Sequence, residues 1–91
     1  MAMDIFRVFR RAVAEAQVHL GELYLRIGSS SMAREVLVQA VHGLELLRDV
    51  RLVEAVELMA IAEDEFGRPR EAVRWRERAA KLSARVIAPV V

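Results

Sequence analysis

The chain has 91 residues, enough for one small domain. Its formal net charge of +1 excludes a protein that binds a charged polymer through its overall charge. Hydrophobic residues make up 55% and charged residues 30% of the sequence, which excludes an intrinsically disordered chain. Because a chain of this length buries only a modest core, so high an apolar fraction predicts surface left over for a partner.

Residues that are absent or rare exclude further classes. The chain has no cysteine and only two histidines, so disulfides and thiolate metal sites are excluded and a metal centre is not expected. No apolar run approaches the roughly 20 residues of a membrane span. Residues 1–16 are amphipathic and not a plain apolar block, so we expect no signal peptide and a cytoplasmic location.

The first predicted helix covers about residues 4–27, with Asp4 as its N-cap. Its apolar positions recur at steps of three and four residues, which predicts one apolar face. They are Ile5, Phe9, Ala12, Val13, Ala16, Leu20, Leu23, Tyr24 and Ile27. Phe6 and Val8 widen this face beyond what packing against one neighbouring helix needs.

Three further helices are predicted, at about residues 31–47, 50–66 and 69–86. Gly28 and the serines after it form the first break, since Gly adopts the left-handed conformation that ends a helix. Asp49 is the expected cap of the third helix, and Gly67-Arg68-Pro69 separates the third helix from the fourth. The second helix carries an apolar stripe of Ala33, Val36, Leu37, Ala40, Val41 and Leu44.

The first two helices carry a recognisable motif, consisting of Leu20, Gly21, Tyr24, Gly28, Ala33, Leu37 and Ala40. It resembles the tetratricopeptide repeat (TPR), with Leu-Gly-x-x-Tyr in one helix, a turn Gly and small-large-small residues in the next. Gln17 and Glu45 stand where that family has an aromatic residue and a Pro.

A second, degenerate copy follows in one register. Gly28 and Gly67 are 39 positions apart, and so are Ala33 and Ala72. The same offset relates Ala40 to Ala79, Leu20 to Met59, Gly21 to Ala60, Ile27 to Phe66, and Val36 to Trp75. The repeats cover about residues 14–47 and 53–86. A 39-residue step exceeds the usual ~34 residues and resembles the long-repeat TPR proteins of bacterial transcription and signalling regulators.

The resemblance implies an all-α fold of two stacked helical hairpins, a short TPR-like solenoid. The alternative is a closed four-helix bundle made of the same helices. It also implies a non-catalytic protein–protein interaction module, an adaptor or assembly domain. Two alternative functions remain open, which are a self-association domain without a groove ligand and a fragment of a nucleic-acid-associated regulator.

Catalytic chemistry is not indicated. Ser29, Ser30 and Ser31 lie at a turn, where capping accounts for them, and no base accompanies them. His19 lies near Glu15 and Glu22, but one such pair is ordinary helix surface. We therefore expect neither an enzyme nor a cofactor.

The resemblance places a partner groove on the first helix of each hairpin. Its expected positions are Glu15, Val18, Glu22, Leu25, Glu54, Glu57, Ile61 and Glu65. The TPR proteins that grip a peptide carboxylate use basic residues there. Acids predominate in this chain, so the expected partner is basic or apolar.

The third and fourth predicted helices carry opposite charge. The third is acidic and the fourth is rich in Arg, which indicates pairing between the two helices or, less favourably, nucleic-acid binding.

The two ends of the chain predict a further interface. Solenoid ends normally carry polar residues. Both ends of this chain are apolar, so we expect a homo-oligomer that uses Ile5, Phe6, Phe9, Leu82, Val86 and Ile87.

Overall fold

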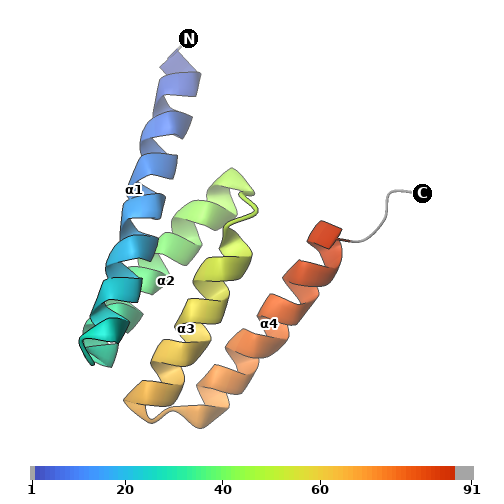
Figure 1. Ribbon diagram of the computed structural model, residues 1–91. Helices are drawn as coiled ribbons and strands as arrows, with labels where there is room; N and C mark the ends of the chain where they lie inside the picture. Colours follow the sequence, from blue (N-terminus) through green and yellow to red (C-terminus); the bar gives the residue numbers. More distant parts are fainter. Residues whose placement is uncertain (1, 88–91) are drawn as a thin grey trace.

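The protein is all-α. The computed structural model describes residues 2–87, in which four helices follow one another: α1 (Ala2–Arg26), α2 (Ser30–Leu47), α3 (Leu52–Phe66) and α4 (Pro69–Ile87) (Figure 1). The four predicted helices are confirmed, and their bounds differ by up to two residues. The prediction of Asp4 as N-cap is wrong, because α1 begins before it. The third helix begins later than expected because Asp49 accepts a hydrogen bond from the backbone N–H of Arg51 at 2.9 Å, which belongs to the preceding turn.

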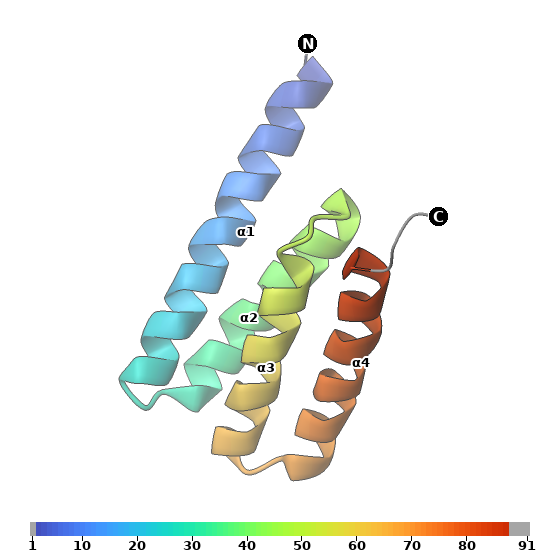
Figure 2. The same ribbon diagram turned by 45° about the vertical axis from the view of Figure 1, so that its right-hand side comes forward.

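The helices form two antiparallel hairpins in an open stack. α1 packs along α2, α2 along α3, and α3 along α4, whereas α1 touches α3 only lightly. Within residues 2–87, α1 and α4 do not touch, and they lie at opposite edges of the stack (Figure 2). The molecule is accordingly flat, with extents of 44 × 33 × 16 Å. A closed bundle would bring its first and last helices together, so the arrangement is the stacked pair of hairpins.

The two hairpin turns repeat one another in backbone detail. Gly28 and Gly67 take φ angles of 79° and 92°, the left-handed region in which Gly carries no Cβ penalty. The backbone N–H of each donates to a carbonyl three residues earlier at 3.1 Å, and the next N–H donates five residues back at 2.8 Å. The hydrogen bonds that begin α2 and α4 are likewise 39 positions apart, from Ala33 to Ser29 and from Ala72 to Arg68. The repeat register is therefore confirmed at both turns.

The core lies between the hairpins. Its small residues recur in both copies, with Ala33, Ala40, Ala72 and Ala79 all buried. A Cβ at Gly21 would overlap the side chain of Leu37, so the two helices of the first hairpin approach closely because Gly occupies this position.

In the second hairpin a tryptophan fills the core space that Leu37 fills in the first. The buried residues form two clusters, one that includes Leu44 and Val56 and one that includes Leu37 and Met59, and Trp75 packs against both. Its neighbour Arg76 occupies the position of Leu37 and points outward to pair with Asp64. The indole therefore supplies the bulk that Arg76 does not.

One sequence-based expectation about α1 is wrong. Of the positions predicted for its apolar stripe only Tyr24 is partly buried, whereas the others are exposed, and a different face packs on α2 and α3. That packed face carries Ala14, Val18 and Gly21, all buried, with Leu25 partly buried beside them. Small residues allow the neighbouring helices to come close, whereas the bulkier residues of the other face are left outside.

Candidate interaction surfaces

The most apolar exposed surface runs along the outer side of α1. We call it the outer stripe and define it as Phe6, Phe9, Val13, Ala16, Leu20, Leu23 and Ile27. All are exposed, and the six larger side chains keep between 39% and 67% of their surface accessible to solvent. Ile27 follows the last residue of α1, and its N–H still donates to the carbonyl of Leu23 at 3.1 Å, so it continues the helical spacing.

Two shallow hollows border the outer stripe where α1 passes the end of α2. One, of about 280 Å³, is lined by Phe9 and Val13 from α1 and by Leu46 from α2, among others. The other, of about 320 Å³, lies between Phe6 and Leu46. The first turns of α1 project beyond α2 (Figure 1), so this end of the outer stripe is open on several sides.

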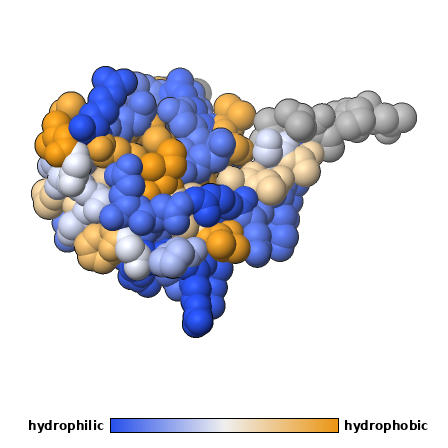
Figure 3. Space-filling model, turned by 60° about the horizontal axis from the view of Figure 1, so that its bottom comes forward, coloured by the Kyte–Doolittle hydropathy of each residue, from blue (hydrophilic) through white to orange (hydrophobic). Residues whose placement is uncertain are grey.

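The other end of the outer stripe lies at the hairpin turns. Leu23 and Ile27 are exposed there, and so are Met32 and Phe66 on neighbouring segments. Figure 3 views the molecule from this side, and hydrophobic side chains are visible among hydrophilic ones. The exposed apolar surface therefore extends along α1 from Phe6 to Ile27.

The residues predicted for self-association do not form one patch. Ile5, Phe6 and Phe9 are exposed together on α1. Leu82, in contrast, lies on α4 at the opposite edge of the stack and packs against the core. The side chains of Val86 and Ile87 fall outside the described residues. The two sets of residues lie at opposite edges of the stack, because α2 and α3 separate α1 from α4, and self-association through them stays a prediction.

The predicted groove is only partly present on α1. Val18 is 6% exposed and belongs to the core, so its assignment to the groove is wrong. Leu25 packs partly into the core as well. Glu15 pairs with Arg51 across the α1–α3 gap, and Glu22 lies 3.9 Å from His19. On α1 the groove positions are therefore occupied by packing and by ion pairs.

On α3 the predicted groove positions are exposed. They are Glu54, Glu57, Ile61 and Glu65, which we call the acidic row. Other carboxylates of α3 are neutralised, since Glu63 pairs with Arg34 and Asp64 pairs with Arg76. The ion pairs found among the described residues include none from the acidic row. Its negative charge is therefore free to act on a partner.

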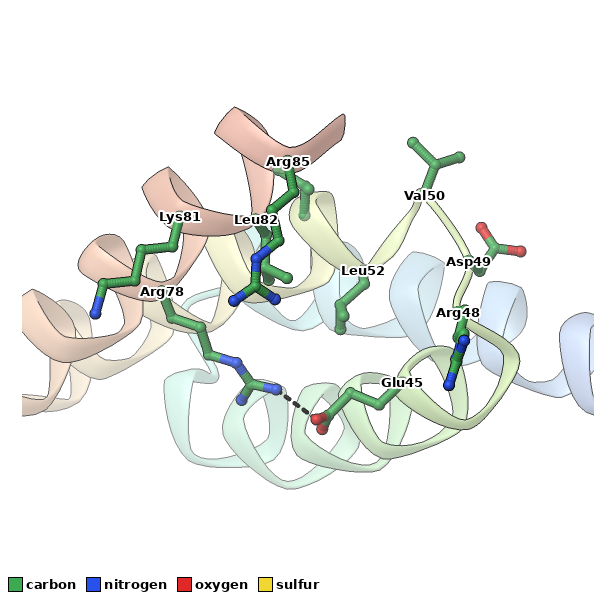
Figure 4. A pocket seen from close by; sticks show the side chains of 10 residues that line it. Glu45, Arg48, Asp49, Val50, Leu52, Arg78, Lys81, Leu82 and Arg85 are labelled. Atoms are coloured by element: carbon green, nitrogen blue, oxygen red, sulfur yellow. Dashed lines mark ion pairs between the residues drawn. The ribbon is translucent and has the colours of Figure 1, made fainter. Parts of the chain in front are cut away.

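A pocket that sequence analysis missed lies between the end of α2 and α4 (Figure 4). It has a volume of about 640 Å³. Its apolar floor includes Leu52 and Leu82, and Arg48, Lys81 and Arg85 lie around it. The fourth cation, Arg78, is neutralised by Glu45, with 2.6 Å between Nη2 and Oε2.

The signal for this pocket in the sequence was the run of basic residues on the fourth helix. The sequence could not place that run beside the α2–α3 turn, because the contact joins segments about 30 residues apart. Arg48 has a φ of 51°, the left-handed conformation, at the position that ends α2. Glycine is the usual residue at such a position.

The needs of a metal site and of a membrane span can be compared with the described residues. Within that part of the chain, no group of three or more His, Cys, Asp or Glu side chains is placed to hold a metal ion. None of the helices in residues 2–87 is both long and apolar enough to cross a membrane.

Comparisons with protein-family models, with curated proteins and with solved structures give no match.

Proposed function

We propose that this chain is a non-catalytic protein–protein interaction module of the TPR-like type, acting in the cytoplasm as an adaptor or assembly domain. The observation that carries the proposal is the outer stripe of α1, whose six large apolar side chains all remain exposed in the described chain. Contiguous apolar surface of this kind is rare on monomeric proteins and usually marks an interface.

The acidic row gives the proposed module a second surface with a definite chemistry. Glu54, Glu57 and Glu65 surround the exposed side chain of Ile61. Such a surface favours a partner segment that is basic or apolar, because carboxylates attract Arg and Lys while Ile61 provides apolar contact. An acidic peptide tail would be repelled.

Nucleic-acid binding is the weaker alternative because much of the positive charge on α4 is already neutralised. Arg74 pairs with Glu71 at 3.4 Å, and Arg76 and Arg78 pair with carboxylates of α3 and α2. Phosphate contacts would have to displace these ion pairs.

Site-specific photocrosslinking in the cells from which the chain comes tests the proposal. A benzophenone amino acid replaces Phe9 in one variant and Glu35, an exposed polar residue of α2, in the control. We expect discrete adducts with other proteins from position 9, distinguished by mass from adducts between two copies of this chain, and only background from position 35. A further Leu20→Glu substitution should abolish the adducts. Equal background at both positions would contradict the proposed function.

A further inference from the structure

The outer stripe of α1 has the spacing of a helix-pairing seam. Its residues follow one another at alternating steps of three and four, from Phe6 to Ile27. In a heptad description, Phe6, Val13, Leu20 and Ile27 occupy one apolar position, and Phe9, Ala16 and Leu23 occupy the other. This seven-residue repeat, sustained over three heptads, is the pattern of two α-helices packed along each other with side chains interdigitating.

The seam is free of the contacts that hold the fold. The packed face of α1 lies on a different side of the helix, at Ala14, Val18 and Gly21. α1 therefore presents two apolar faces, and the four helices of the chain cover only one of them. The uncovered face is about 30 Å long, since each helical residue rises 1.5 Å.

We infer that the outer stripe of α1 pairs with the outer stripe of a second copy of this chain, with the two helices antiparallel. A two-fold interface must be complementary to itself. An antiparallel pairing that sets Phe6 against Leu23 of the partner also sets Phe9 against Leu20 and Val13 against Ala16. Every layer then combines a larger side chain with a smaller one.

A parallel pairing in register fits less evenly. It stacks Phe6 on Phe6 and Phe9 on Phe9 at one end, and Ala16 on Ala16 in the middle. Such layers are overfilled at one end and leave a gap in the centre, and both overpacking and cavities are destabilising. The antiparallel arrangement avoids both problems.

The surroundings of the seam support a second copy as its occupant. The hollows beside Phe6 and Phe9 lie at the end of the stripe that the antiparallel pairing brings against Leu23 and Leu20 of the partner. Apolar knobs of one copy therefore meet apolar hollows of the other. The positions that flank the seam include Arg10, Gln17 and Arg26 but no carboxylate, and the pairing sets Arg10 beside Gln17 without facing two like charges.

Sedimentation equilibrium of the purified chain tests the association, which goes beyond the proposed binding of other proteins. We expect a reversible dimer in the micromolar range. The double variant Phe9→Glu/Leu20→Glu should raise the dissociation constant by at least roughly 100-fold, because two buried layers per dimer each gain facing carboxylates. The control double variant Val50→Glu/Val73→Glu changes exposed valines outside the stripe and should leave the dissociation constant unchanged. Circular dichroism should show equal helicity for all variants.

The orientation is tested with cysteines, which the natural chain lacks. Chains carrying Phe6→Cys and chains carrying Leu23→Cys should form a disulfide-linked dimer when mixed and oxidised. Each alone should not, since equal positions near the ends lie about 25 Å apart in the antiparallel pair. Linkage of Phe6→Cys to itself would overturn the antiparallel arrangement.

Two further outcomes would overturn the inference. One is a wild type that stays monomeric at high micromolar concentration, and the other is a dimer that persists in the stripe double variant. Neither outcome affects the photocrosslinking test. Adducts of Phe9 with another protein, combined with a monomeric purified chain, would retain the proposed function and remove self-association.

Discussion

The guanidinium of Arg34 on α2 pairs with the carboxylate of Glu63 on α3, which is only 3% exposed. The same guanidinium lies over the ring of Phe66, 4.3 Å from its centroid. Glu63 occupies the position in the second repeat that Tyr24 occupies in the first. A buried acid is tolerated there because the neighbouring hairpin supplies its counter-ion, so this pair joins the two repeats.

We therefore predict that Arg34→Ala destabilises the fold by roughly 2–4 kcal/mol, because it leaves a buried carboxylate without its main partner. Arg68 lies 4.0 Å from the same carboxylate and retains part of the compensation. Urea unfolding at one protein concentration measures the change. The control Arg74→Ala removes an exposed pair with Glu71 and should cost less than about 1 kcal/mol. Equal effects of the two substitutions would show that the Glu63 pair is not a structural link.

The two helical glycines of the first hairpin should respond to alanine with opposite signs. A Cβ at Gly21 would overlap the buried Leu37, so Gly21→Ala is expected to destabilise the protein, and Gly21→Leu should cost about 1–3 kcal/mol through overpacking. A Cβ at Gly43 would lie 3.6 Å from that of Ala14, an ordinary contact. Gly43→Ala should therefore stabilise by about 0.5–1 kcal/mol through helix propensity. Thermal unfolding of both alanine variants checks the signs, and stabilisation by Gly21→Ala would contradict the close approach of α1 and α2.

Substitutions at the left-handed turn positions should also differ in sign. Gly67→Ala places a Cβ at a φ of 92° and should cost about 1–2 kcal/mol. Arg48→Gly removes the same penalty at a φ of 51°, partly offset by the greater freedom of Gly in the unfolded chain, and should stabilise by about 0.5 kcal/mol. Urea midpoints of the two variants and the wild type test this pair. A loss of stability in Arg48→Gly would mean that the Arg48 side chain contributes more than its backbone conformation costs.

The acidic row should select among model peptides. A fluorescent amphipathic helix of Lys and Leu should bind, whereas a matched helix of Glu and Leu should not, because Glu54, Glu57 and Glu65 have no counter-ion among the described residues. Fluorescence anisotropy gives the affinity, which should fall by about tenfold when these three residues become Gln.

The control for this measurement exchanges Glu35 and Glu77, two exposed acids on α2 and α4, for Gln. It should leave the affinity for the basic helix unchanged. Unchanged binding by the acidic-row variant would exclude this surface as the site for a basic partner.

Local features of the sequence were sufficient to predict the hairpins. The turns at Gly28 and Gly67 and the 39-residue register depend on a few neighbouring residues, whose backbone preferences act wherever the segment lies. The groove positions that the TPR resemblance implied on the third helix, Glu54, Glu57, Ile61 and Glu65, are exposed as expected.

Only the tertiary structure decided which faces are covered. α1 carries two faces on which apolar residues recur at helical spacing. This spacing does not indicate which of the two faces packs against the other helices. The face with Ala14 and Gly21 is buried because small residues let α2 come close, which leaves Phe9 and Leu23 in solvent. Val18, which was predicted to line the groove, is buried for the same reason. The separation of Leu82 from Phe6 and the pocket beside Arg48 likewise depend on contacts between distant segments, which no local spacing encodes.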